Sequence, residues 1–178
     1  MRTRRALVAI ALTLLLSGCG DDDASLSRDE QKAARALAVE FQGQDPTDFA
    51  RDTGICLGKH LVNDLGTRKL IDGGLLKEDL TVATTRKAVT DRSVAEGYAD
   101  AIVACQDVRG QVESRRDRYP KATDADIDTY VDCVEAIDDT VLHRAIVAAA
   151  LKKPDPSGAA YTKQSKACAQ KLGPPKAE

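Results

Sequence analysis

Aromatic residues are scarce in this sequence: 178 residues include no tryptophan, two phenylalanines and four tyrosines. The core must therefore be built from alanine, valine, leucine and isoleucine, which favours closely packed helices. Regular alternation of apolar and polar residues, the pattern of a half-buried strand, is also missing. These absences predict an all-α fold.

Long hydrophobic runs are missing as well. The apolar run from Ala6 to Leu16 has eleven residues, fewer than the about 20 that a membrane-spanning helix needs. It follows the basic segment 1–5 and ends in Leu16-Ser17-Gly18-Cys19, so it has the organisation of a signal peptide. The last four residues resemble the lipobox of bacterial lipoproteins. The resemblance implies cleavage before Cys19 and acyl chains such as palmitate on that cysteine. Two acyl chains suffice for stable anchoring.

These features predict how the chain is organised. Residues 1–18 are the signal peptide, 19–26 a lipidated flexible tether, 27–173 a helical domain and 174–178 a tail. Without the three arginines of the signal peptide, 23 basic residues remain against 28 acidic ones, a formal charge of −5. Nothing in this balance suggests nucleic acid as a partner. We expect the protein at the extracytoplasmic face of the bacterial cell membrane, held there through lipid on Cys19.

Four cysteines remain beyond Cys19: Cys56, Cys105, Cys133 and Cys168, spaced by 49, 28 and 35 residues. These spacings do not fit a zinc site, which needs close pairs of ligands. Four cysteines in an exported chain predict two disulfides. Three pairings are possible, and spacing alone does not choose among them.

Apolar periodicity predicts about six helices in one disulfide-stapled bundle. The expected capping boxes are Ser27-x-x-Glu30 and Thr123-x-x-Asp126, and Asp45-Pro46 is expected to open the second helix. The predicted helices span residues 27–42, 46–65, 68–71, 91–118, 123–151 and 157–172, and the one over 123–151 either runs straight or is kinked.

The helical domain has the pattern of two related halves, 46–118 and 123–173. Each half has a helix with a cysteine, a short helix, and a helix with Tyr-x6-Cys, which is Tyr98 to Cys105 in the first and Tyr161 to Cys168 in the second. If each half is one unit, its cysteines lie on helices that pack together. The repeat therefore predicts the pairs Cys56–Cys105 and Cys133–Cys168.

The segment Cys56–Gly66, read as Cys-Leu-Gly-Lys-His-Leu-Val-Asn-Asp-Leu-Gly, resembles small cysteine-paired helical lipoproteins and secreted proteins of actinobacteria. The likeness extends over about residues 50–110 and more loosely over the second half. It implies a short helix after the segment and a second cysteine about fifty residues on. It implies no activity and no site residues.

One acidic segment has two interpretations. Read as an EF-hand loop, it would bind calcium through acids at positions 1, 3, 5, 9 and 12. However, Thr129 stands where the loop needs glycine, and the apolar Ile127 stands at position 4. The same residues fit a capped helix, which we favour, so we expect no metal and no cofactor. The calcium candidates are Asp124, Asp126, Asp128, Asp132 and Glu135.

A basic stretch precedes these acids. It could meet anionic lipid headgroups or cell-wall polymer, or be ordinary helix surface paired partly with the acids, which we favour. Its residues are Arg109, Arg115, Arg116, Arg118 and Lys121.

The sequence has no G-x-S-x-G motif and no phosphate loop, and its two histidines, His60 and His143, fit no metal-binding or catalytic motif. We therefore expect no catalytic residues and a role in binding an unidentified envelope protein or polymer. One alternative is an enzyme whose cleft brings a histidine to a carboxylate. The other is a carrier of an apolar ligand in an inter-helix cavity lined by Val94, Tyr98, Ile102, Ile137 and Val141.

Overall fold

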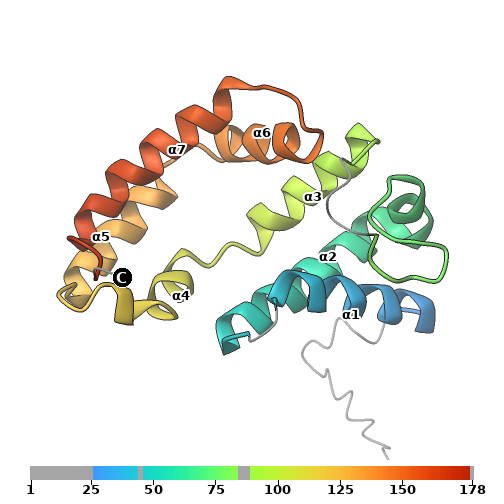
Figure 1. Ribbon diagram of the computed structural model, residues 1–178, viewed down its shortest axis with the longest axis horizontal. Coiled ribbons are helices and arrows are strands. Elements are labelled where there is room, and N and C mark those ends of the chain that lie inside the picture. The colour runs from blue at the N-terminus through green and yellow to red at the C-terminus, as the bar shows by residue number, and fades with distance from the viewer. Residues whose placement is uncertain (1–25, 44–45, 84–88, 177–178) are drawn as a thin grey trace, which may run out of the picture.

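The computed structural model describes residues 26–43, 46–83 and 89–176 (Figure 1). Within these residues it holds seven α-helices and, apart from one isolated antiparallel bridge between Leu76 and Val82, no β-structure. The predicted all-α fold is confirmed. The helices are α1 (Arg28–Gln42), α2 (Asp48–Asp72), α3 (Arg92–Ala104), α4 (Val108–Glu113), α5 (Asp124–Glu135), α6 (Asp139–Ala150) and α7 (Pro156–Ala169), with 3-10 turns η2 (Arg116–Arg118) and η3 (Gln170–Leu172). None of the described helices is both long and apolar enough to cross a membrane.

Both predicted capping boxes form. The Ser27 hydroxyl accepts a hydrogen bond from the Glu30 amide while the Glu30 carboxylate accepts one from the Ser27 amide, and Thr123 and Asp126 make the same exchange at α5. Each box satisfies amides that have no partner inside the helix. The predicted opening of the second helix at Pro46 is wrong: Thr47 is the N-cap of α2, because its hydroxyl accepts from the Ala50 amide.

Helices α1 and α2 approach each other closely through small residues. Gly54 and Gly58, one turn apart on α2, face Ala38 and Ala34 on α1. A Cβ on Gly58 would lie 2.3 Å from the Ala34 carbonyl oxygen, and one on Gly54 would lie 2.8 Å from that of Ala38. The two backbones can therefore meet only because these glycines carry no side chain.

The helix breaks differ partly from the prediction. Gly66 interrupts α2 as expected, since its φ of 72° is in the left-handed region that favours glycine. The single helix predicted over 91–118 is wrong, because α3 ends at Cys105 and Asp107 caps α4 through the Gly110 amide. The helix predicted over 123–151 is likewise divided, because Asp138 caps α6 through the Thr140 amide.

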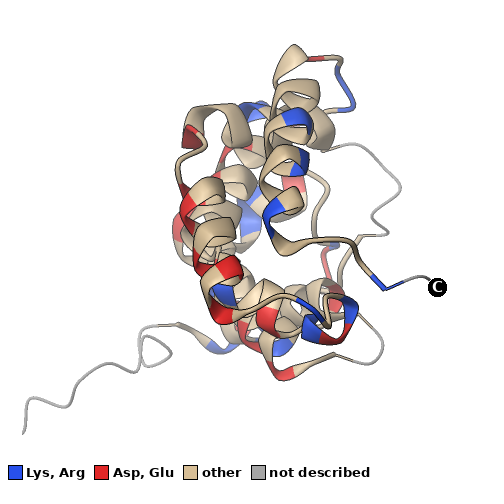
Figure 2. Ribbon diagram, turned by 90° about the vertical axis from the view of Figure 1, so that its left-hand side faces the viewer, with Lys and Arg blue, Asp and Glu red and all other residues tan. Residues whose placement is uncertain are grey.

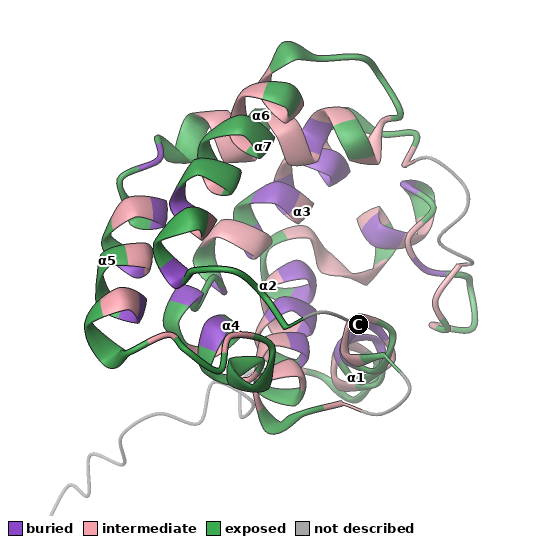
Figure 3. Ribbon diagram, turned by 60° about the vertical axis from the view of Figure 1, so that its left-hand side comes forward, coloured by how far each residue is buried: buried purple, intermediate pink, exposed green. Residues whose placement is uncertain are grey.

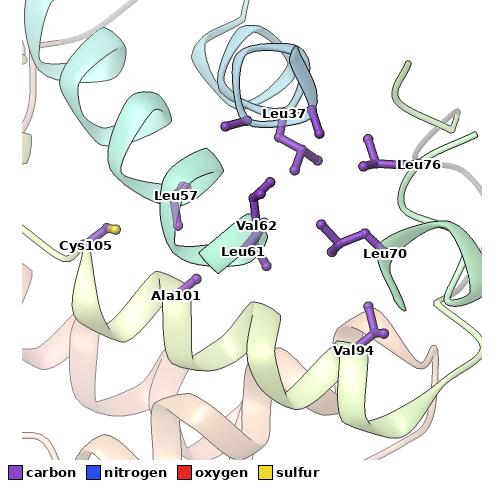
Figure 4. Close-up of a cluster of buried hydrophobic side chains, with 11 residues drawn as sticks. Leu37, Leu57, Leu61, Val62, Leu70, Leu76, Val94, Ala101 and Cys105 are labelled. Carbon is purple, nitrogen blue, oxygen red and sulfur yellow. The ribbon is translucent and has the colours of Figure 1, made fainter. Parts of the chain in front are cut away.

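The buried side chains form separate clusters. The first joins α1, α2 and α3 with the segment that follows α2, and includes the fully buried Leu37, Leu61 and Val94. Figure 4 shows Val62 of α2 pointing toward Leu37 of α1. The second joins α4, α5, α7 and η3 around Ile127. Val108 and Val112, which fall in the same predicted helix as Val94, belong to this second cluster.

Helix α3 links the helices of the first cluster to those of the second. It packs on α2 through one side and on α6 through another, while α6 also packs on α7. Ala95 and Ala99 of α3 form a small third cluster with Val147 of α6. In Figure 1, α3 accordingly runs between α2 and α6, and Figure 3 shows the buried residues on the inward sides of the helices.

Candidate functional site

The four cysteines of the described chain pair as the repeat predicts. Cys56 of α2 bonds to Cys105 at the end of α3, with Cα atoms 5.8 Å apart, and Cys133 of α5 bonds to Cys168 of α7, with Cα atoms 5.5 Å apart. Each disulfide joins two helices of one hydrophobic cluster. Cys19 and most of the tether lie outside the described residues, so lipidation stays a prediction.

One histidine lies beside a disulfide. The ring of His60 is one helical turn after Cys56, and one of its nitrogens and the sulfurs of Cys56 and Cys105 lie within 4.8 Å of one another. Because both sulfurs are in the disulfide, they are not thiolate ligands in this structure. His60 also faces Asp64, with Nδ1 3.6 Å from a carboxylate oxygen, on the surface of α2.

The acidic segment considered as a calcium loop is helix α5 over its whole length, Asp124–Glu135, so the helical interpretation is confirmed. Thr129, at the position where a loop would turn, donates its hydroxyl to the Ala125 carbonyl oxygen within that helix. The pKa of Asp126 is lowered because the Thr123 side chain and amide donate to its carboxylate. The negative charge of Asp126 is thus held in the first turn of α5, where the positive end of the helix dipole stabilises it.

The basic residues before α5 are partly paired with its acids. Arg109 binds the carboxylate of Asp128 and lies 3.5 Å from that of Glu113. Arg116 lies 2.7 Å from Asp124. Figure 2 shows Lys and Arg among the Asp and Glu residues in this region, so the surface is mixed rather than one basic patch.

Helices α3 and α6 enclose a surface hollow of about 460 Å³ that contains the other histidine. Nε2 of His143 lies 3.0 Å from the carboxylate of Asp100, which the sequence did not predict as its partner. Histidine and carboxylate side chains are common residue types in acid–base catalysis. The hydroxyl in the lining of the hollow, Thr140, instead donates to Asp138 at the cap of α6.

Four of the five residues named for an apolar carrier cavity belong to two different hydrophobic clusters. Val94, Tyr98 and Ile102 pack in the first cluster, and Ile137 is buried in the second. Tyr98 stacks at a tilt on Phe41, with ring centroids 5.9 Å apart, and burial raises the pKa of its hydroxyl. These four side chains are thus divided between two clusters and do not line one shared cavity.

A different groove follows the line where α1 and α2 meet. It has a volume of about 240 Å³ and is lined by the apolar Leu26, Ala34, Ala38 and Ile55 together with Gln31, Arg35 and Lys59. Both charged residues of the lining are cations. The groove is a surface feature that the sequence analysis missed.

Two signals in the sequence could have revealed this groove. The glycines of Gly54-x3-Gly58 predict a close helix crossing, and Ile55 and Val39 are apolar residues directly after Gly54 and Ala38. In the structure Ile55 is 42% exposed and Val39 is 66% exposed, and they are the large hydrophobic residues that stand out at the described surface.

Comparisons with protein-family models, curated proteins and solved structures found no match to this chain.

Proposed function

We propose that this chain is a lipoprotein of the extracytoplasmic face of a bacterial cell membrane, and that its helical domain binds a protein or polymer of the cell envelope. The observation that carries the proposal is the sequence Leu16-Ser17-Gly18-Cys19 directly after an apolar run of eleven residues. Position, flanking residues and spacing all agree with a lipoprotein signal peptide.

The disulfides support export. Disulfides persist in oxidising compartments and are rare where glutathione and thioredoxin keep thiols reduced. The chain has five cysteines, and four of them are joined in the pairs Cys56–Cys105 and Cys133–Cys168. Cys19 is the cysteine of this sequence that neither pair includes, which suits the proposed thioether between its sulfur and a diacylglyceryl group.

Binding fits the described surface better than transport or catalysis. Four of the five residues expected to line a carrier cavity are divided between two hydrophobic clusters. The pair His143–Asp100 brings a histidine to a carboxylate, which is one requirement of the enzyme alternative. The Thr140 hydroxyl beside the pair, however, donates to Asp138 at the cap of α6. The hollows at the surface away from the anchor, such as the one beside His143, are the features that a partner could occupy.

Mass spectrometry of the N-terminal peptide from the native membrane tests the proposal. The wild-type protein should begin at Cys19 and carry the mass of its acyl chains, and Cys19→Ala should stay unprocessed and unacylated. Ser17→Ala is the matched control, since it keeps a small residue in the cleavage motif and should be processed normally. A wild-type Cys19 without acyl mass would overturn the proposal.

A further inference from the structure

We infer that the groove between α1 and α2 is a membrane-facing surface that docks on the anionic phospholipid headgroups of the membrane holding the anchor. The inference rests on the proposed lipid anchor at Cys19. It adds an orientation: α1 and α2 lie against the bilayer, and the other helices face away from it.

The position of the groove relative to the anchor is the first reason. Leu26, where the described chain begins, lies in the lining of the groove. Seven residue steps separate it from Cys19, and an extended chain of that length reaches at most about 25 Å. The groove is therefore held near the bilayer surface.

The chemistry of the surface is the second reason. Ile55 in the lining of the groove and Val39 of α1 are exposed apolar side chains. Arg35 lies one turn before Val39 on α1, and Lys59 lies one turn after Ile55 on α2. Exposed apolar residues beside cations are the combination by which an interfacial helix binds an anionic membrane.

The distribution of charge favours the same orientation. The acidic helix α5 lies away from α1 and α2, toward the other end of the molecule (Figure 1). The lining of the groove holds two cations and no acid, so an anionic bilayer attracts the groove more strongly than it attracts α5.

The tether fits the groove less well than the membrane does. Residues 20–25 read Gly-Asp-Asp-Asp-Ala-Ser, and the methyl group of Ala24 is their one apolar side chain. They could offer charge to Arg35 and Lys59, but not the apolar surface that the leucine, alanine and isoleucine side chains of the groove require.

Tryptophan fluorescence tests the inference, because the wild-type chain has no tryptophan. The full lipidated protein carrying Ile55→Trp is reconstituted into vesicles of phosphatidylcholine with about one third phosphatidylglycerol, in which the acyl chains are brominated as quenchers. Gln164→Trp, an exposed neutral position on α7, is the matched control. Quenching in the Ile55→Trp protein without quenching in the Gln164→Trp protein supports docking.

Charge neutralisation separates electrostatic docking from mere proximity. Arg35→Gln with Lys59→Gln should lower the ratio of docked to free domains by up to about 25-fold, at no more than about fivefold for each cation. The control pair Lys163→Gln with Lys166→Gln, on α7, should leave the quenching unchanged. Equal losses in both pairs would overturn docking through the groove.

The outcomes distinguish the two proposals. If the protein floats with the vesicles and the Ile55→Trp indole is not quenched, the anchor stands and the docking inference fails, leaving the groove to the tether or to an envelope partner. If the protein does not float with the vesicles and Cys19 carries no acyl mass, the proposed function itself fails. Unchanged helical circular dichroism in each variant excludes unfolding as the cause.

Discussion

Gly58 on α2 faces the carbonyl oxygen of Ala34 on α1 so closely that a Cβ at residue 58 would lie 2.3 Å from that oxygen. The atom in the way belongs to the backbone of another helix, so it cannot rotate aside as a side chain would. This contact sets the distance between α1 and α2, and hence the shape of the groove between them.

Gly58→Ala should therefore destabilise the protein. In an unobstructed helix the same change stabilises by about 0.5–1 kcal/mol, but overpacking a close contact costs about 1–3 kcal/mol. Urea unfolding should show a net loss. Gly158→Ala is the control, because it lies in α7 with open space around its Cβ position, and it should stabilise. A stabilised Gly58→Ala would contradict the close approach.

Local rules predicted much of this fold correctly. The capping boxes at Ser27 and Thr123, and the break at Gly66, depend on residues close in sequence, and the structure confirms them. The break before Asp107 was missed because an apolar stripe continues across it, while a single aspartate caps the next helix. The break before Asp138 was predicted only as a kink, for the same reason.

Contacts between distant segments were harder to predict. The disulfide pairing was correct because a repeat supplied the long-range information. No comparable signal linked His143 to Asp100, which approach only because α3 packs on α6. The groove between α1 and α2 depends on the same kind of long-range contact.

Removal of a disulfide should cost a large part of the stability. The bonds Cys56–Cys105 and Cys133–Cys168 close loops of 49 and 35 residues, and the loop-entropy model assigns each about 4 kcal/mol. A domain of this size has only about 5–15 kcal/mol of stability. The double variants Cys56→Ala with Cys105→Ala, and Cys133→Ala with Cys168→Ala, should each lower the urea midpoint strongly.

Peptide mapping without reductant checks the connectivity behind this prediction. The peptide with Cys56 should be linked to the one with Cys105, and the peptide with Cys133 to the one with Cys168. A link between Cys56 and either Cys133 or Cys168 would defeat both the pairing and the repeat.

Acid should destabilise the protein through its helix caps. The pKa of Asp138 is lowered because the Thr140 side chain and amide donate to its carboxylate, and Ser157 lowers the pKa of Asp155 in the same way. A carboxyl group with a lowered folded-state pKa contributes stability above its unfolded value, about 3.9, which is lost as the pH falls through the folded pKa.

Thermal unfolding as a function of pH measures this effect. The contribution of these caps should be constant from about pH 7 to pH 5 and decline below about pH 4. Asp138→Asn keeps an oxygen that can accept from the Thr140 amide but does not titrate, so its acid decline should be shallower than that of the wild type. Asp132→Asn, in the middle of α5, is the control. An identical decline in Asp138→Asn and the wild type would contradict the role of the cap.

Calcium should have no effect on the protein, because the acids that would form a loop are spread along α5. An EF-hand loop gathers its ligands by a sharp turn at its sixth position, where this chain has Thr129 within an unbroken helix. Asp126, a ligand in the loop interpretation, instead accepts hydrogen bonds from Thr123 at the helix cap. Calorimetry with calcium in the millimolar range should show no saturable heat. A saturable isotherm that is lost in Asp126→Ala but kept in Asp139→Ala, outside the segment, would mean that α5 can refold into a calcium loop.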